Sequence, residues 1–361
     1  MGGVTASTSP RFTIGNRVLA QGESVYVVAE LSANHNQDFE RALATVDAAR
    51  EAGADAIKLQ TYTADTLTID SSEPPFFLDR GPWKGQSLYR LYQTAFTPWE
   101  WHQPIRERAA ACGLDFFSAA FDPSAVEFLE RLDVPIHKIA SFELVDIPLI
   151  EAVASTGKPL ILSTGMASLE EIDEAVAAAR AAGARDVLLL KCTSAYPAPS
   201  ASLRLRTLVD LAERFECCVG LSDHTLGDVA PVASVALGAV LIEKHFTLSR
   251  AAGGPDSGFS LEPAEFAAMV SAVRTAEAAL GEPGYGALPE ESSNLGLRRS
   301  LYVVEDVAEG EELTPQNVRS IRPAGGLHTR HLSTILGLRA ATDIRRGTPL
   351  EWELIDGAPT P

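Results

Sequence analysis

Short runs of apolar residues recur through most of the chain, and the stretch after each run spaces its apolar positions as a helix does. FERALATVDAAREAG, after the first run, is typical: it has this spacing and ends in glycine, a common C-terminal residue of helices. Strands that alternate with helices predict a parallel sheet, because each parallel connection needs a crossover. The apolar runs are residues 24–31, 56–62, 115–121, 137–143, 159–165, 186–194, 217–225 and 239–247.

Eight strand–helix units within about 250 residues predict a closed (β/α)₈, or TIM, barrel. An open, doubly wound sheet is the main alternative, but the first run is not followed by the GxGxxG motif of dinucleotide-binding sheets. One connection differs from the others: residues 63–103 are long for a link between a strand and a helix, and they are rich in aromatic residues. We expect this insertion to fold over the mouth of the barrel.

The character of the sequence changes after the eighth unit. The segment GEPGYGALPEESSN (281–294) is dense in Gly, Pro and acidic residues, which is typical of a linker. Beyond it, short β-like runs separated by EG and RG turns indicate a small, mainly β domain with a thin core. The sequence therefore predicts a barrel domain over 1–282, a linker over 283–295 and a C-terminal domain over 296–361.

Charge and composition exclude several classes of function. The formal net charge of −18 argues against nucleic acid as a partner, but a local basic pocket can still bind a small anion. No apolar run is long enough to span a membrane, and the N-terminus MGGVTASTSPRFTIG lacks the apolar core of a secretory signal. The 4 cysteines form no CxxC pair, so we expect reduced, buried thiols in a cytoplasmic protein.

Polar side chains stand at the end of every predicted strand, where barrels of this kind build their active sites. His224 in GLSDHT and His245 in IEKHFT end neighbouring strands, so their rings can converge. Two histidines with positions left open for water and substrate suit a catalytic divalent metal, whereas either one alone is more often a core residue. Alternation places Glu243 beside His245, where it would orient the ring, and turns Lys244 towards the helices as a buried ion-pair residue.

A second group consists of point cations and hydroxyls, and it suits a phosphate or carboxylate ligand. The alternatives for its lysines are a Schiff base, as in an aldolase, or a structural salt bridge. The nearby serines favour anion binding. The members of this group are Lys58, Lys138, Ser141, Ser163 and Ser222.

Four further residues at the predicted mouth are candidates. Glu30 and Glu143 end different strands, where a carboxylate serves as a general acid or base or balances the lysine charges. Tyr196 in SAYPAP is within reach of a ligand, and Asp256 in GGPDSGFSLEP is placed to bind hydroxyls. The paired tryptophans of PWEWH (98–102) are interpreted as packing residues at the start of a helix.

Taken together, these motifs resemble the sialic acid synthase family, whose members condense phosphoenolpyruvate with an N-acetylated sugar. Within that family, FFLDRGPWKGQSLYRLYQTAFTPWEWH and AELSANHN resemble the pseudaminic acid branch. The segments that carry the resemblance span nearly the whole chain in order: AELSANHNQ, KLQTYTADTL, KIASFEL, ILSTGM, KCTSAYPAP, GLSDHT, IEKHFTLSRAAGGPDSGFSLEP and SIRPAGGLH.

The resemblance implies a fold, ligands and an assembly. It implies a TIM barrel joined to an antifreeze-like (SAF) domain, in a homodimer whose SAF domains reach over the partner's barrel. It implies a divalent metal on His224 and His245, usually Mn²⁺, with Mg²⁺ or Co²⁺ as alternatives. It assigns phosphoenolpyruvate to the group of lysines and serines, and an essential glutamate to Glu30. The implied sugar-binding residues are Gln60, Glu143, Tyr196, Asp256 and, from the SAF domain, Arg322.

The implied reaction belongs to the biosynthesis of nonulosonic acids for cell-surface glycans. It joins phosphoenolpyruvate, water and the open-chain aldehyde of 2,4-diacetamido-2,4,6-trideoxy-altropyranose, with C–O cleavage and release of phosphate. An N-acetylneuraminate or legionaminic acid synthase using an N-acetylmannosamine-like sugar is the alternative within the family, and an inactive sugar-acid sensor is the alternative outside it. The chain departs from the family's pattern at two places in the substrate region. After the third predicted strand it has Ala119-Ala120-Phe121 where the neuraminate branch has Thr-Pro-Phe, and Ser194 stands where an Asn is common.

Overall fold

The computed structural model describes residues 10–79, 81 and 83–358. The chain divides into two compact units, Met1–Gly281 and Glu282–Pro361. The expected barrel domain begins with residues 1–9 and the expected C-terminal domain ends with residues 359–361. Both segments lie outside the described residues. No helix in the described part of the chain is both long enough and apolar enough to cross a membrane.

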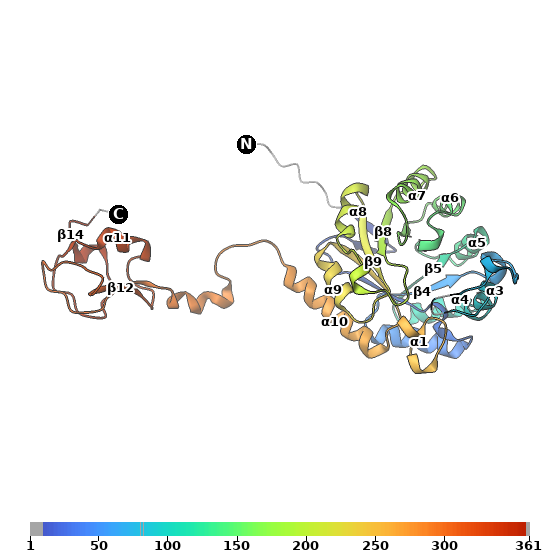
Figure 1. The fold of residues 1–361 in the computed structure, drawn as a ribbon, viewed down its shortest axis with the longest axis horizontal. Helices are drawn as coiled ribbons and strands as arrows, with labels where there is room; N and C mark the ends of the chain where they lie inside the picture. The colour runs from blue at the N-terminus through green and yellow to red at the C-terminus, as the bar shows by residue number, and fades with distance from the viewer. Residues whose placement is uncertain (1–9, 80, 82, 359–361) are drawn as a thin grey trace. The chain divides into compact units, whose positions relative to one another are not determined.

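The first unit is a closed barrel of parallel strands in the order β10-β3-β4-β5-β6-β7-β8-β9. Each of the eight predicted runs contains one of these strands, so the barrel is confirmed and the open sheet is excluded. Figure 1 shows the helices surrounding the strands. The strands are β3 (Tyr26–Glu30), β4 (Ala56–Thr61), β5 (Asp115–Ala120), β6 (His137–Ile139), β7 (Leu160–Ser163), β8 (Val187–Cys192), β9 (Cys218–Asp223) and β10 (Ala239–His245).

The helices that cover the barrel begin and end where the sequence provides caps. In α7 (Leu169–Ala181), Ser168 and Glu171 form a reciprocal capping box, and Gly183 just beyond the helix has a φ of 111°. Its buried positions recur every three or four residues, so one stripe packs on the strands. The other covering helices are α1 (Phe39–Glu51), α4 (Trp99–Ala111), α5 (Pro123–Arg131), α6 (Ile147–Ala154), α8 (Thr207–Phe215), α9 (Val229–Ala236) and α10 (Pro263–Leu280).

A short hairpin, β1 (Phe12–Ile14) and β2 (Arg17–Leu19), precedes the barrel and was not predicted from the sequence. Its apolar side chains Phe12, Ile14 and Leu19 are buried in one cluster with residues of the barrel interior. The adjacent cysteines fall in different layers, because Cys218 belongs to this inner cluster and Cys217 to the cluster between strands and helices. All four cysteines are free thiols, and only Cys112 is partly exposed.

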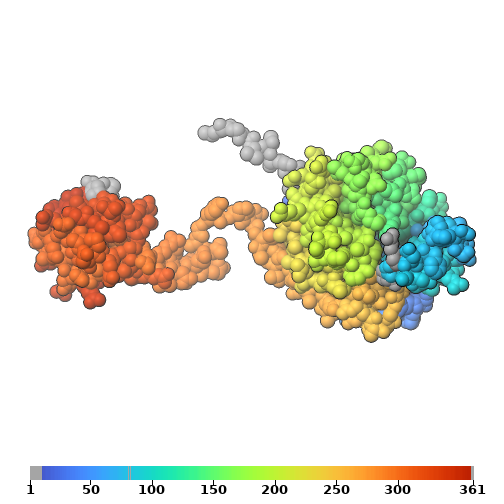
Figure 2. Space-filling view, viewed as in Figure 1, coloured from blue at the N-terminus to red at the C-terminus, as the bar shows by residue number. Residues whose placement is uncertain are grey.

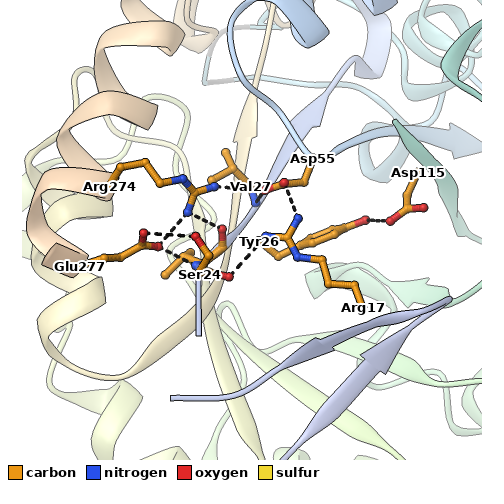
Figure 3. A network of polar contacts seen from close by, with 9 residues as sticks. Arg17, Ser24, Tyr26, Val27, Asp55, Asp115, Arg274 and Glu277 are labelled. Atoms are coloured by element: carbon orange, nitrogen blue, oxygen red, sulfur yellow. Dashed lines mark hydrogen bonds and ion pairs between the residues drawn. The ribbon is translucent and has the colours of Figure 1, made fainter. Parts of the chain in front are cut away.

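A polar network at the start of β3 ties the hairpin to the last barrel helix (Figure 3). Asp55 accepts a hydrogen bond from the Val27 amide at 2.8 Å and forms ion pairs with Arg17 of β2 and Arg274 of α10. On α10, Glu277 accepts a hydrogen bond from Arg274 at 2.7 Å and from the Val25 amide at 2.6 Å. The first strand and the last helix are thereby joined where the barrel closes.

The insertion between β4 and α4 contains α2 (Ala64–Leu67), the 3₁₀ helix η2 (Pro74–Phe76) and α3 (Leu88–Ala95). In Figure 2 its described residues, in blue, stand out from the surface of the barrel unit. Side chains of α2 and α3 line the cavity at the barrel mouth, which confirms the expected cover. The tryptophans of PWEWH pack at the start of α4, as expected: Trp99 lies 4.7 Å from the ring of Phe128.

Among its described residues, the second unit has its own small core of ten buried apolar side chains, including Leu301, Val318 and Leu350. Its strands pair antiparallel as β11 (Ser300–Val303) with β12 (Val318–Ile321) and β13 (Arg339–Ala340) with β14 (Ile355–Asp356). Short helices complete it: η8 (Thr329–His331), α11 (Leu332–Ile335) and η9 (Trp352–Leu354). The 3₁₀ helix η7 (Pro289–Leu297) lies in the stretch expected to be a linker.

Candidate active site

A cavity of about 390 Å³ opens at the carboxyl ends of the barrel strands, within the size range of small-molecule sites. It is lined by eleven of the thirteen candidate residues: Lys58, Gln60, Lys138, Ser141, Glu143, Ser163, Tyr196, Ser222, His224, His245 and Asp256. Of the other two, Glu30 lies behind Lys58, and Arg322 is an exposed residue of the second unit.

A buried group of charges joins β3, β4 and β10. The Lys58 ammonium lies 2.7 Å from Glu30 Oε2 and 3.5 Å from Glu243 Oε1. Gln60 donates to the second oxygen of Glu30 at 3.1 Å, and Ser222 donates to Glu243 at 3.2 Å. Lys58 is therefore neutralised by the protein itself.

This arrangement corrects the role predicted for Glu243. Its contacts are with Lys58 and Ser222, while Nδ1 of His245 is buried without a hydrogen-bond partner among the described residues. Glu243 thus does not orient the His245 ring. The opposite charge of Lys58 on β4 attracts the carboxylate more strongly than a neutral imidazole does.

Lys138 differs from Lys58 because its partners are neutral. Its ammonium donates to Ser163 Oγ at 2.7 Å and to the Ile139 carbonyl at 2.8 Å, and the residue is 1% exposed. Within the described residues no carboxylate lies within ion-pair distance of it. Burial lowers the pKa of Lys138 to about 8. A buried cation without a counterion is costly, and an anionic ligand in the cavity would remove that cost.

The two candidate acid–base residues are held differently. Burial raises the pKa of Glu30 to about 7 against the lowering effect of Lys58, and both of its oxygens face protein groups. Burial also raises the pKa of Glu143, on η3 (Ser141–Glu143), to about 7. Oε2 of Glu143 is buried with no hydrogen-bond partner among the described residues, and the side chain lines the cavity. Glu143 therefore has a free carboxyl oxygen for a ligand.

The two histidines converge as predicted, with ring centroids 5.4 Å apart. Nδ1 of His224 lies 2.9 Å from the Thr193 carbonyl, so this nitrogen carries the proton and Nε2 keeps its lone pair when the ring is neutral. Burial lowers the pKa of His245 well below its usual value, which keeps that ring neutral. The ring centroid of Tyr196 lies 4.4 Å from that of His224, with the ring planes tilted by 45°, and the ring centroid of Phe259 lies 5.0 Å from that of His245.

These rings fit a metal ion with two protein ligands. Lone pairs on neutral imidazoles are the form that binds metal, and the buried Nδ1 of His245 has no other partner in the described part of the chain. The described residues contain no group of three or more His, Cys, Asp or Glu side chains arranged to hold an ion. Water or substrate would complete the coordination.

Some strand-end residues face the helices instead. Lys244 forms a fully buried ion pair with Asp223, which confirms its predicted role. Ser118 lies 2.7 Å from the Thr61 hydroxyl, in a buried network with His102. Alternation along each strand explains these outcomes, because neighbouring residues point to opposite sides of the barrel wall.

Several residues of the cavity escaped the sequence analysis. The Ser32 hydroxyl and the Ala33 amide both donate to Oδ2 of Asp256, so they position a predicted sugar-binding carboxylate. Cys192 lines the cavity with its sulfur 3.8 Å from His224 Nδ1, and alternation along β8 was the signal that would have found it. The glycine pair of GGPDSGFSLEP suits a close backbone approach, but Gly254, with a φ of 122°, is not among the residues that line the cavity and approaches the side chain of Asn36, where a Cβ would lie 2.1 Å from its oxygen.

Comparison with known proteins agrees with this architecture. The model of the NeuB family matches residues 45–285, and the model of the SAF domain matches residues 298–356. The NeuB match covers more than half of the 361 residues of this chain, so the chain belongs to the NeuB family. It carries a SAF domain at its C-terminus.

Individual relatives resemble nearly the whole chain. It is 43% identical over 331 residues to a pseudaminic acid synthase of Helicobacter pylori, covering 91% of this chain and 97% of that protein. It is 44% identical over 329 residues to the pseudaminic acid synthase of Campylobacter jejuni, covering 91% and 96%. Among solved structures, an N-acetylneuraminic acid synthetase from Leptospira borgpetersenii in complex with citrate matches with a TM-score of 0.71 and 31% identity, covering 80% of this chain and 95% of that one.

Proposed function

We propose that the protein is a pseudaminic acid synthase. In this reaction, carbon 3 of phosphoenolpyruvate attacks the aldehyde carbon of open-chain 2,4-diacetamido-2,4,6-trideoxy-altropyranose. Water adds at carbon 2, and the C–O bond to phosphate then breaks, which leaves a 2-keto acid and inorganic phosphate. The observation that carries the proposal is the 43–44% identity to synthases of that name over 91% of this chain.

The cationic wall of the cavity would hold phosphoenolpyruvate. Lys138 supplies an uncompensated positive charge, and Ser163 lies within hydrogen-bond distance of it. Ser141 and Ser222 line the same cavity and supply hydroxyl donors. Lys58 also lines the cavity, but it is already paired with Glu30. It would therefore help to position phosphoenolpyruvate as well as attract its negative charge. These donors would also stabilise the phosphate as it leaves.

Glu143 is the better placed of the two glutamates for proton transfer. Its free oxygen and its pKa of about 7 suit donation of a proton to the aldehyde oxygen as the new C–C bond forms. Glu30 would instead hold Lys58 and Gln60 in place. Gln60, Tyr196 and Asp256 also line the cavity and would contact the sugar.

A divalent metal would be held by His224 and His245, with Mn²⁺ as the expected ion and Mg²⁺ or Co²⁺ as alternatives. When bound there it would act as a Lewis acid towards the aldehyde oxygen. The protein's own part is to hold the two rings close together, His224 by the Thr193 carbonyl and a tilted contact with Tyr196, and the neutral His245 by an edge-on contact with Phe259.

The proposal includes a homodimer in the cytoplasm, in which Arg322 of each SAF domain enters the partner's cavity. Exposed apolar side chains in the segments that follow β6, β7 and β9 support an association of copies, since large exposed apolar areas mark interfaces. These residues are Phe142, Val145, Met166, Leu226 and Val229, with exposures from 58% to 78%.

A test uses phosphoenolpyruvate labelled with ¹⁸O in the bridge between carbon 2 and phosphorus. With the trideoxy diacetamido sugar and Mn²⁺, we expect phosphate that keeps the label and a nine-carbon keto acid, both seen by mass spectrometry. Unlabelled phosphate would refute C–O cleavage. Release of labelled phosphate with a nine-carbon keto acid formed from N-acetylmannosamine would favour the alternative, an N-acetylneuraminate or legionaminic acid synthase, which the 31% identity to the Leptospira synthetase supports.

A further inference from the structure

The insertion helix α3 turns its apolar stripe towards the cavity. Four residues spaced i, i+3, i+4 and i+7 along it, Leu88, Leu91, Tyr92 and Ala95, all line the cavity. A stripe with this spacing normally packs against a protein core. Here the apolar face is covered only in part by protein, and the rest forms a wall for a ligand.

Two aromatic residues from the strand ends continue this wall into the barrel. Tyr62, after β4, lies with its ring 5.7 Å from Tyr92 and 5.2 Å from Phe121, which follows β5. All three line the cavity. We call Leu88, Leu91, Tyr92, Ala95, Tyr62 and Phe121 the apolar wall.

The cavity therefore has two chemically different sides. One side carries Lys138 with Ser163 and Ser222, whereas the apolar wall offers hydrocarbon and ring faces. The two phenol groups of the wall stay protonated, because burial raises the pKa of Tyr62 and Tyr92 and nearby carboxylates raise both further. A ligand that fills the cavity would meet a cation and hydroxyls at Lys138, Ser163 and Ser222 and hydrocarbon at the apolar wall.

We propose that the apolar wall selects the methyl group at carbon 6 of the sugar, with Leu91 as its main specificity-determining residue. This inference rests on the proposed function. Phosphoenolpyruvate takes the cationic side and the aldehyde meets it there, so carbon 6, at the far end of the open chain, reaches the wall. A hydroxyl at carbon 6 would lose its hydrogen bonds to water against Leu91, which is 7% exposed, and a methyl group would not.

The experiment compares the trideoxy diacetamido sugar with its 6-hydroxy analogue of the same configuration. The ratio of their kcat/KM values is measured with phosphoenolpyruvate and Mn²⁺. An apolar pocket discriminates such pairs by roughly 10- to 100-fold, and we expect that preference for the 6-deoxy sugar in the wild type. Leu91→Asn should lower the ratio at least about tenfold by giving the hydroxyl a partner, and Leu88→Gln should shift it in the same direction.

Tyr89→Phe is the matched control on the same helix. Tyr89 does not line the cavity, and its hydroxyl bonds Asp65 at 2.9 Å, so this variant perturbs α3 without changing the wall. The ratio should stay at the wild-type value, with folding checked by thermal unfolding for every variant. Leu91→Met, which keeps the wall apolar, should also leave the ratio within about twofold.

The outcomes separate the two proposals. Equal kcat/KM for both sugars in the wild type, or an unchanged ratio in folded Leu91→Asn and Leu88→Gln, would overturn the role of the wall and leave the synthase intact. A selective loss of the 6-hydroxy sugar in Tyr92→Phe would show that a phenol binds the hydroxyl, which also contradicts the inference. No phosphate release with either sugar would refute the proposed function and the inference with it.

Discussion

Replacing Lys138 with methionine should have two opposite effects, because one buried ammonium group is costly in the free protein and useful in the complex. The side chain is 1% exposed and bonds only to the Ser163 hydroxyl and the Ile139 carbonyl within the described residues. Methionine has a similar length and no charge. The substitution therefore removes the cation with little change in packing volume.

The first effect is on the stability of the ligand-free protein. Burial lowers the pKa of Lys138 from 10.5 to about 8, which is equivalent to about 3 kcal/mol of lost stability. The folded pKa is the lower one, so this cost is fully present below pH 8 and disappears as the pH rises towards 10.5. Lys138→Met should thus raise the free energy of unfolding by about 1–3 kcal/mol at pH 7, and the gain should shrink above pH 8.

The second effect is on the binding of phosphoenolpyruvate and on kcat/KM for this substrate. Losing one partner of a buried, hydrogen-bonded charge pair costs about 2–5 kcal/mol, so kcat/KM for phosphoenolpyruvate should fall roughly 30-fold to several thousand-fold. Phosphate release measures kcat/KM, calorimetric titration measures binding, and urea unfolding with and without phosphoenolpyruvate measures stability. Ligand should stabilise the wild type and not the variant.

Lys158→Met is the matched control. Lys158 precedes β7 at the opposite end of the barrel and forms a 3.0 Å ion pair with Glu130, so it should leave kcat/KM unchanged and alter stability by about 0–1 kcal/mol. If Lys138→Met kept its affinity for phosphoenolpyruvate and lost stability, the reasoning would be refuted, and Lys138 would be a structural cation.

Three further predictions concern other parts of the barrel unit. Glu143→Gln should remove the decline in kcat/KM that we expect near pH 7, since the wild-type carboxyl must be protonated to act as an acid, and should leave only the decline near pH 8 that follows deprotonation of Lys138; a decline near pH 7 that persists in the variant would assign it to another group. We expect Mn²⁺ to raise the Tm of the wild type and EDTA to reverse the rise, and His245→Ala should abolish this effect; a retained rise would exclude His245 as a ligand. Asp55→Asn, which weakens the network in Figure 3, should lower stability by about 1–3 kcal/mol in urea unfolding without altering KM for phosphoenolpyruvate, and a changed KM would contradict its purely structural role.

The sequence predicted the barrel because its pattern repeats eight times and each strand lies in a short run rich in apolar residues. The position of the site followed, since carboxyl ends of parallel strands meet on one face. Alternation then separated Lys244, which pairs with Asp223 in the wall, from His245, which lines the cavity. These inferences need only the local period of the chain.

Other features depend on contacts between distant segments. The partner of Glu243 is set by the strand order β10-β3-β4 in the closed barrel, which brings Lys58 to it from 185 positions earlier in the chain. The hairpin from Phe12 to Leu19 has strands of three residues, too short for a period to show. The stripe on α3 has an ordinary amphipathic spacing, so nothing in the sequence says that it faces a ligand cavity.

The most direct test of the proposed function is phosphate release by the purified full chain with phosphoenolpyruvate and Mn²⁺, sugar by sugar, with and without EDTA. The account predicts release with the trideoxy diacetamido hexose, abolished by EDTA and restored by added Mn²⁺. Release with N-acetylmannosamine and not with the trideoxy sugar would contradict the assignment to pseudaminic acid, and no release with any N-acetylated sugar would contradict the condensation itself.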